Sequence, residues 1–259
     1  IQPIFATNLR GKAGARPVKV DSYGRVLEVL SEKQSSSGQN IALTLDYDLQ
    51  TFTHKLMKNK TGSVVVMDIE NFNLLTMYSA PSYDLMSFTP FATSQDRLDI
   101  MKNEDKPLLN RSIEGSYPPG SVYKVLLAVI AMMEGKITPE TTFNCPGELQ
   151  YGNFTYRCWK KGGHGKLDLV HAIEQSCDVY FYNVGLATGI DAISKYSNLF
   201  SLGIKTGIDL PNEKFGFFPS REWKKEVRNE PWYPGETIIT SIGQGYIATT
   251  PMQIAVMLS

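Results

Sequence analysis

Two kinds of hydrophobic spacing follow one another along this chain, and each predicts its own type of element. Apolar and polar residues alternate in several short segments, which is the pattern of a half-buried β-strand. The strongest pair, Ser63–Ile69 and Leu74–Ser79, predicts a β-hairpin with one buried strand. Weaker alternation predicts three further strands, at Val18–Val20, Val26–Val29 and Ile41–Leu45.

Continuous apolar runs and helical spacing predict helices after these strands. The run from Val125 to Met133 is apolar on every face and too short to span a membrane, so it predicts a helix packed inside a sizeable domain. Four other segments predict helices: Leu49–Met57 after Asp46, Asp168–Gln175, Val179–Gly189 and Met252–Leu258. A hairpin followed by helices predicts an α+β fold with an antiparallel sheet.

The remaining stretches are polar or rich in turn formers, and they indicate the domain division. Residues 1–37 are polar and short of core positions, and the serines that precede Gly38 are typical of a linker or exposed turn. We therefore expect a small module over residues 1–37 and a main domain over residues 38–259. Within the main domain, residues 81–106 are mixed and polar, and residues 138–166 are rich in loops and glycine.

Length and charge narrow the class of protein. A chain of 259 residues can bury a large core in one or two domains. It carries 26 basic and 26 acidic residues, and this balance argues against nucleic acid or an anionic membrane as the main partner. The sequence contains no run of about 18 apolar residues and opens with no signal-peptide pattern. We expect any membrane anchor or export signal to lie outside this sequence.

The segment Ser121-Val122-Tyr123-Lys124 carries the candidate chemistry. Positions three apart share a helix face, so the Ser121 hydroxyl and the Lys124 amine can meet at the first turn of the predicted helix. Apolar surroundings favour the neutral form of a lysine, which can then act as a base for a nucleophilic serine. A capping serine followed by a lysine that reaches the surface would explain the same four residues.

Several separated motifs together resemble the transpeptidase region of the class B penicillin-binding proteins, in particular those of the rod-elongation machinery. This resemblance implies the penicillin-recognising serine transpeptidase fold, an antiparallel sheet with a helical subdomain. It runs from about residue 62 to the end, and LRGKAG and VDSYGRV resemble the pedestal module that precedes it. The matching segments are GSVVVMDIE, SAPSYD, NRSIEGSYPPGSVYK, CWKKGGHGKLDL, QSCDVYFYNVG, TGIDLPNE, REWKK, PWYPGETI and GQGYIATTPMQ.

The resemblance assigns roles to four catalytic candidates. It implies that Ser121 attacks the penultimate D-alanine carbonyl of a peptidoglycan stem peptide, and that Lys124 takes the serine proton. Ser176-Cys177-Asp178 resembles the second motif of the family, with Asp in place of Asn. Ser176 would relay a proton to the leaving D-alanine, and Asp178 would bond Lys124 or the substrate. As an alternative or in addition, Asp178 could cap the helix that begins at Val179.

The third motif of the family, K-T-G, is expected on a strand that follows the equivalent of GQGYIATTPMQ. Lys205-Thr206-Gly207 spells it, but Gly203 and Gly207 bracket these residues with turn formers, so we reject Lys205 as catalytic. We expect the last sheet strands to lie beyond this sequence, and we expect the chain as given to be inactive without them. Among other candidates, Trp232 and Tyr233 could line the substrate groove and Gln244 lies in a turn near the active site. Trp159 and Trp223 are expected to be packing anchors.

The cysteines suggest a metal site. Cys145, Cys158, His164 and Cys177 supply three thiolates and one imidazole, the ligand set of a structural tetrahedral zinc site. Such a site would tie the loop at 145–164 to the turn at Ser176. Two alternatives stay open. The family works in the periplasm, where a Cys145–Cys158 disulfide could form, or the three thiols could be buried and unlinked.

The resemblance also implies the biological setting. The expected reaction is D,D-transpeptidation of stem peptides during cell elongation, with β-lactams as inhibitors. The expected partners are the rod-shape scaffold protein MreC and the glycan polymerase RodA, and the expected place is the periplasm, with an anchor in the inner membrane. A β-lactamase or D,D-carboxypeptidase of the same superfamily, or a non-catalytic penicillin-binding sensor, would share many of these motifs.

Overall fold

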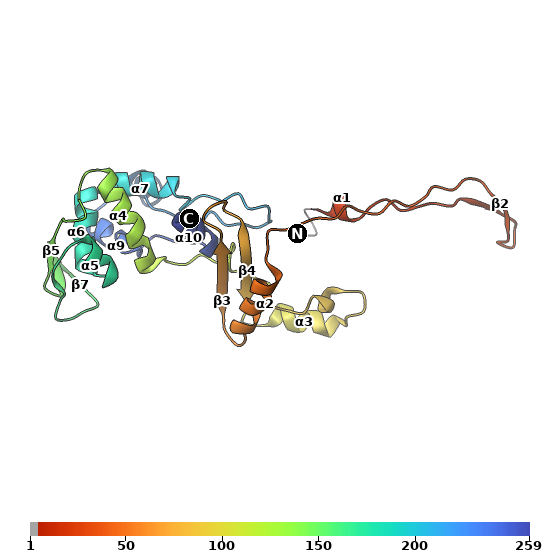
Figure 1. The fold of residues 1–259 in the computed structure, drawn as a ribbon, viewed down its shortest axis with the longest axis horizontal. Coiled ribbons are helices and arrows are strands. Elements are labelled where there is room, and N and C mark those ends of the chain that lie inside the picture. Colours follow the sequence, from red (N-terminus) through yellow and green to blue (C-terminus); the bar gives the residue numbers. More distant parts are fainter. Residues whose placement is uncertain (1–4) are drawn as a thin grey trace. The chain divides into compact units, whose positions relative to one another are not determined.

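The computed structural model describes residues 5–259, and the chain divides into two compact units (Figure 1). One unit comprises Ile1–Thr44 with Gly207–Pro211, and the other comprises Leu45–Thr206 with Asn212–Ser259. Residues 1–4 of the module predicted over 1–37 lie outside the described residues. The predicted boundary after residue 37 stays a prediction.

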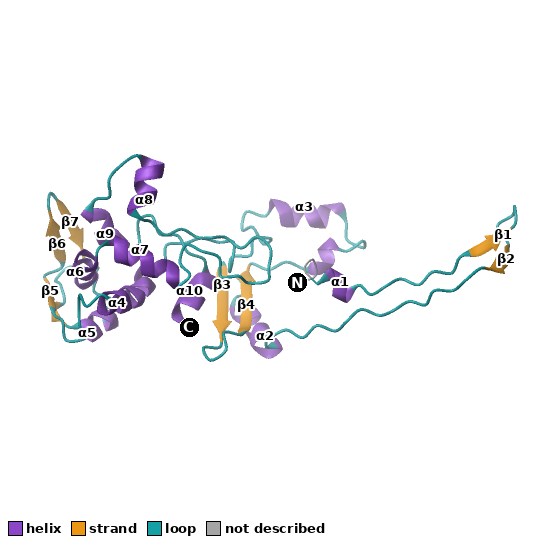
Figure 2. Ribbon diagram, turned by 90° about the horizontal axis from the view of Figure 1, so that it is seen from above, coloured by secondary structure: helices purple, strands orange, loops and turns teal. Residues whose placement is uncertain are grey.

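The first unit contains a long two-stranded arm (Figure 2). After the short helix α1 (Ala6–Leu9), strand β1 (Val18–Val20) pairs antiparallel with β2 (Val26–Val29), which confirms both predicted strands. Every residue of β1 and β2 is exposed. The predicted strand at Ile41–Leu45 is wrong, because these residues form neither helix nor strand in the structure. Alternation gives a segment two faces but does not supply a neighbouring strand to bond.

The second unit begins with the predicted hairpin. Strands β3 (Gly62–Met67) and β4 (Leu74–Ala80) pair antiparallel. Helix α2 (Tyr47–Leu56) packs on β4, and α10 (Pro251–Leu258) packs on β3. The Asp46 carboxylate caps α2 by accepting the Leu49 amide at 2.7 Å. The expectation of one buried strand is wrong, because every residue of β3 is only half-buried and β4 buries only Thr76 and Ala80.

The core of this unit lies among three helices, α4 (Tyr123–Met133), α6 (Asp178–Thr188) and α9 (Pro234–Thr240) (Figure 1). Helix α6 contacts both of the others and is buried along most of its length. Gly185 lets α6 and α9 approach closely, because a Cβ at that position would overlap the side chain of Ser241. The apolar run at Val125–Met133 is confirmed as part of helix α4, which packs one face against α6, but Val125, Met132 and Met133 are exposed.

Short elements complete the second unit. The glycine-rich stretch predicted as loops holds four strands, and within residues 5–259 all strands pair two by two as antiparallel ribbons. The polar segment 81–106 also holds a helix, whose Thr93 and Asp96 form a capping box. The additional elements are η1 (Leu85–Phe88), α3 (Ser94–Lys102), η2 (Gly120–Val122), β5 (Phe143–Cys145), β6 (Glu148–Tyr151), β7 (Phe154–Arg157), β8 (Gly165–Leu167), α5 (Leu169–Glu174), α7 (Ile190–Leu199), α8 (Arg221–Trp223) and the π-helical turn η3 (Lys224–Arg228).

The helices predicted near the second motif are present with slightly shifted ends. Helix α5 ends before Gln175, and α6 begins at Asp178, one residue earlier than predicted. Cys177 caps α6, because its sulfur accepts the Tyr180 amide. The alternative reading of Asp178 as the cap is therefore wrong, and its carboxylate is left for other contacts. None of the helices in the described residues is long and apolar enough to cross a membrane.

Candidate active site

Ser121 lies in the turn η2 that leads into α4, and a contact from a distant loop holds this turn. The Gly120 amide donates to the Gly243 carbonyl at 3.0 Å. Both glycines have a positive φ, 59° for Gly120 and 70° for Gly243. A Cβ on Gly243 would overlap the Gly120 carbonyl, so the two backbones can come this close only because the residue is a glycine. The loop at Gly243-Gln244-Gly245 thus supports the turn of the candidate nucleophile, and Gln244 itself is exposed.

Lys124 is the second residue of α4, and its side chain is only 2 % exposed. Its Nζ donates to three oxygens: the Ser176 carbonyl at 2.9 Å, Ser176 Oγ at 3.1 Å and Asp178 Oδ1 at 2.7 Å. A lysine that reached the surface would be free of such contacts, so the structure rejects that interpretation. The buried amine is held by the turn between α5 and α6.

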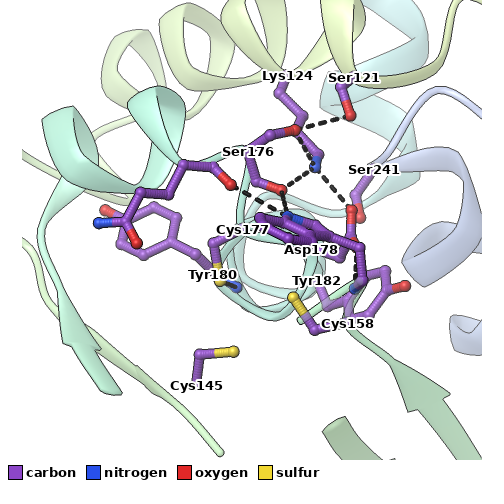
Figure 3. A network of polar contacts seen from close by, with 12 residues as sticks. Ser121, Lys124, Cys145, Cys158, Ser176, Cys177, Asp178, Tyr180, Tyr182 and Ser241 are labelled. Atoms are coloured by element: carbon purple, nitrogen blue, oxygen red, sulfur yellow. Dashed lines mark hydrogen bonds and ion pairs between the residues drawn. The ribbon is translucent and has the colours of Figure 1, made fainter. Parts of the chain in front are cut away.

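Ser176 lies between Ser121 and Lys124, the two residues that the sequence predicted to meet. Its Oγ lies 2.9 Å from Ser121 Oγ and 3.1 Å from Lys124 Nζ, so the three groups form a continuous hydrogen-bonded chain (Figure 3). The sequence predicted a direct meeting of Ser121 and Lys124 across one helical turn. The structure places the hydroxyl of Ser176 between them. Ser176 has a φ of 49°, which is unusual for a residue other than glycine, asparagine or aspartate.

Asp178 connects Lys124 to the loop that follows Cys158. One carboxylate oxygen accepts Lys124 Nζ, and the other accepts the backbone amide of Trp159 at 3.0 Å. The carboxylate is thus satisfied on both sides by donors that come from different elements. Of the two roles weighed from the sequence, the contact with Lys124 is the one the structure shows.

Trp159 is a residue of this site that sequence reasoning missed. It was expected to be a packing anchor, yet its side chain is 64 % exposed. Its indole Nε1 donates to the carbonyls of Gln175 and Ser176 at 3.1 and 3.2 Å. The signal in the sequence was its position directly after Cys158, at the start of a basic, glycine-rich loop.

Cys145, Cys158, His164 and Cys177 come together as the sequence predicted. Their ligand atoms all lie within 4.8 Å of one another, and His164 Nδ1 lies 3.6 Å from the sulfurs of both Cys145 and Cys158. All three cysteines are buried free thiols, so no disulfide joins them in the described part of the chain. Figure 3 shows the cysteines in the same view as Ser176 and Asp178.

The protonation of the cluster follows from its burial. Burial lowers the pKa of His164, which keeps the imidazole neutral and able to bind a metal at neutral pH. Burial, with the Cys145 thiol nearby, raises the pKa of Cys177 to about 12. Without a cation, Cys177 therefore stays a thiol. The Nε2 atom of His164 is buried without a hydrogen-bond partner among the described residues.

The arrangement fits a tetrahedral zinc ion in size and chemistry. Zn–S bonds of roughly 2.3 Å and Zn–N bonds of roughly 2.0 Å place the ligand atoms of a tetrahedron about 3.5 Å apart. The two S···N distances of 3.6 Å match that spacing. A Cys₃His set is also one of the usual donor sets of structural zinc.

The remaining candidates lie in different surroundings. Trp232 is buried, and its indole donates to Thr237 Oγ1 at 2.8 Å, which fastens it to α9. Tyr233 is exposed and lines a pocket of about 560 Å³ together with three other aromatic residues, Phe154, Tyr156 and Tyr246. Lys205 lies in a segment without helix or strand, with its amine over the ring of Phe215.

Comparison with known proteins agrees with this fold. The model of the penicillin-binding protein transpeptidase domain matches residues 62–259. The chain therefore belongs to the penicillin-binding protein transpeptidase family, whose fold was expected from the sequence.

The similar curated proteins form a narrower group within that family. The chain is 40 % identical to the peptidoglycan D,D-transpeptidase MrdA of Salmonella typhimurium over 98 % of its length. It is 39 % identical to MrdA of Escherichia coli K12, again over 98 % of its length. The chain spans only 41 % of the length of each of these relatives.

Solved structures give the same picture. Penicillin-binding protein 2 of Helicobacter pylori, in its complex with MreC, matches with a TM-score of 0.88 and 38 % identity, over 97 % of this chain and 47 % of that one. Penicillin-binding protein 2 of Pseudomonas aeruginosa, in complex with WCK 5153, matches with a TM-score of 0.83 and 36 % identity, over 87 % of this chain and 50 % of that one.

Proposed function

We propose that this chain is the catalytic part of a peptidoglycan D,D-transpeptidase that cross-links stem peptides through an acyl-enzyme on Ser121. The hydrogen-bonded chain from Ser121 through Ser176 to Lys124 carries the proposal, because it supplies a nucleophile, a relay and a base in contact. The name of the MrdA relatives, which are 39–40 % identical to this chain over 98 % of its length, supports the same reaction.

In the acylation step, Ser121 Oγ forms an ester bond with the carbonyl carbon of the penultimate D-alanine. In the form of the enzyme whose Lys124 amine is deprotonated, the Ser121 proton passes to Ser176 Oγ, while the proton of Ser176 passes to that amine. The three oxygens around Nζ match the three hydrogens of the ammonium formed in this way. The bond to the terminal D-alanine then breaks, and its nitrogen takes a proton back from Lys124 through Ser176.

In the second step, the amine of an acceptor stem peptide attacks the ester carbonyl. The amine loses a proton to the same relay, and Ser121 Oγ regains one as the ester bond breaks. Asp178 holds the lysine in place through both steps, because its carboxylate is the charged partner of Nζ. A β-lactam would form the same ester but release no leaving amine, so the acyl-enzyme would persist.

The acylation test uses the full-length protein that carries this sequence. We expect a fluorescent penicillin to label the wild-type protein covalently, and Ser121→Ala to abolish labelling. Lys124→Met, which keeps the length of the side chain but removes the amine, should lower the labelling rate by at least 10²-fold. Labelling of Ser121→Ala at the wild-type rate would refute the assignment of the nucleophile. Loss of the label within seconds would favour a β-lactamase over a transpeptidase.

We also propose that Cys145, Cys158, His164 and Cys177 hold a structural zinc ion. Zinc would keep the three sulfurs as thiolates and so fasten the loop at 145–164 to the N-terminal end of α6. Metal analysis of the purified protein should find close to one zinc per chain, and Cys177→Ser should lose most of it. Less than about 0.2 equivalents in the wild type would contradict the site, because a structural site is nearly full.

The cellular setting is proposed from the relatives and from the resemblance in the sequence. We propose that residues 38–259 are the transpeptidase domain and that residues 1–37 belong to a pedestal module. We propose a periplasmic position at the inner membrane, with MreC and RodA as partners. The complex of the H. pylori relative with MreC supports the first partner. MreC purified from the organism that encodes this sequence should co-elute with the full-length protein. Separate elution at micromolar concentrations would argue against this partner.

A further inference from the structure

Trp159 turns its polar groups into the protein while its ring faces solvent. The side chain is 64 % exposed, so burial does not explain why a tryptophan stands here. Both of its N–H groups nevertheless donate to protein acceptors, the backbone amide to Asp178 and the indole to Gln175 and Ser176. Hydrogen bonds, and not burial in the core, therefore define the orientation of this side chain.

The acceptors of Trp159 are also the acceptors of Lys124. The Ser176 carbonyl receives Lys124 Nζ at 2.9 Å and the Trp159 indole at 3.2 Å. The Asp178 carboxylate receives Nζ on one oxygen and the Trp159 amide on the other. Two of the residues that surround the base are thus held from their other side by a single tryptophan.

The turn that Trp159 holds needs such support. Ser176 adopts a φ of 49°, and a residue with a side chain keeps that conformation only where its surroundings impose it. Lys124 and Trp159 both donate to the Ser176 carbonyl, and together they set the orientation of the peptide that follows it. If this peptide rotated, Ser176 Oγ would leave the line between Ser121 and Lys124.

Trp159 is itself fixed from the side of the cysteine cluster. It directly follows Cys158, and its ring meets that of His164 edge to face, with 5.2 Å between the centroids. The cluster thus orients the ring, and the ring orients the turn. The path from the cluster to the relay consists of direct contacts and is only a few residues long.

We propose that Trp159 is a positioning residue for acylation, which acts through the Ser176 carbonyl and Asp178 and does not itself react. This inference rests on the proposed transpeptidase function, because the quantity that it explains is the acylation rate at Ser121. One neutral N–H···O bond in such a position corresponds to about a fivefold change in that rate.

The test replaces the indole N–H and nothing else. β-(3-Benzothienyl)alanine at position 159 keeps the two fused rings and exchanges the N–H for sulfur. Stopped-flow acylation of the full-length protein by benzylpenicillin separates the first-order constant k2 from the dissociation constant K of the initial complex. We expect k2 to fall about fivefold with K unchanged, and Trp159→Phe to give at least the same loss.

Trp223→Phe is the matched control, because Trp223 packs against Phe217 and Tyr246 and is not part of the relay. It should leave k2 unchanged. A benzothienyl variant with k2 within twofold of the wild type overturns the inference. A benzothienyl variant that raises K and leaves k2 unchanged also overturns the inference, because Trp159 would then contact the ligand. Failure of the proposed function is a different result, in which the wild type is not acylated at all.

Discussion

Asp178 is the residue at which two sets of contacts meet. Its carboxylate pairs with the buried Lys124 on one side and accepts the Trp159 amide on the other. Removing one member of a buried ion pair leaves the other charge without compensation, and this costs about 3 kcal/mol or more. The same substitution would release the base from its place, so stability and acylation should fall together.

We therefore expect Asp178→Ala to lower the free energy of unfolding by about 3 kcal/mol. Urea denaturation of the wild type and the variant measures the difference. Asp178→Asn is the matched control, because it keeps an oxygen for Lys124 and should lose less. An Asp178→Ala protein as stable as the wild type would show that the ion pair makes no net contribution.

Gly243 allows a second prediction at the scale of single residues. Its φ of 70° already disfavours other residues, and a Cβ would overlap the Gly120 carbonyl beside Ser121. We expect Gly243→Ala to destabilise the protein by more than 2 kcal/mol and to slow acylation, because the turn of the nucleophile has to move.

Gly152→Ala separates the overlap from the strain in φ. Gly152 also has a positive φ, 58°, but a Cβ there would meet nothing within 4 Å. Gly152→Ala should lower the free energy of unfolding by only about 1 kcal/mol and should leave the acylation rate unchanged. Melting temperatures and penicillin labelling of the two variants compare them, and equal effects at both positions would exclude the close approach as the cause.

At the scale of elements, the start of α5 gives a prediction that depends on pH. The Asp168 carboxylate caps this helix and lies 2.6 Å from His171 Nδ1. This hydrogen bond raises the pKa of His171 above its usual 6.5, and the His171 amide and side chain lower the pKa of Asp168. The contribution of His171 to stability is complete below pH 6.5 and is lost as the pH rises through its raised pKa. That of Asp168 is lost as the pH falls through its lowered pKa.

An NMR titration of the His171 ring measures the first of these shifts. Asp168→Asn should return the pKa of His171 toward 6.5, while α5 persists because asparagine also caps helices well. An unchanged pKa in Asp168→Asn would show that another group raises it.

The sequence predicted those helices and strands whose own residues show a clear hydrophobic pattern or a capping residue. The hairpin β3–β4 was visible from alternation, and α2 was visible from Asp46 followed by an amphipathic stretch. The four strands at 143–167 were not predicted, because the glycines of this stretch indicated loops. Helix α3 was missed although Thr93 and Asp96 spell a capping box, since its residues are mostly polar.

The candidate site was predictable as a set of residues but not as a geometry. Ser121, Lys124, Ser176 and Asp178 were named from motifs, and the structure brings all four together. The position of Ser176 between the other two could not follow from the sequence, because it depends on how α5 and α6 pack against α4. Trp159 was missed because its one signal in the sequence was its position directly after Cys158.

At the scale of the whole molecule, the two units differ in what stabilises them. The strands β1 and β2 of the first unit are exposed at every residue, whereas α6 of the second unit is buried along most of its length. Elements with few buried contacts open at low free energy, and core helices open only with the whole domain.

We expect the backbone amides of β1 and β2 to exchange with D₂O far faster than those of α6, by at least 10³-fold. Hydrogen exchange followed by mass spectrometry of peptic peptides measures both regions in one experiment. Comparable protection in the arm and in α6 would show that the arm is stabilised by contacts other than its own two strands.

The relay through Ser176 has a consequence for protein synthesis. Ser176 follows Ser121 by 55 positions in the sequence, so the nucleophile leaves the ribosome well before its relay does. Until α6 has docked on α4, Ser121 is an ordinary hydroxyl without a base. Under the proposed function, a newly made chain should therefore be insensitive to penicillin until the second motif has folded into place, and the drug should inactivate only molecules that have completed this step.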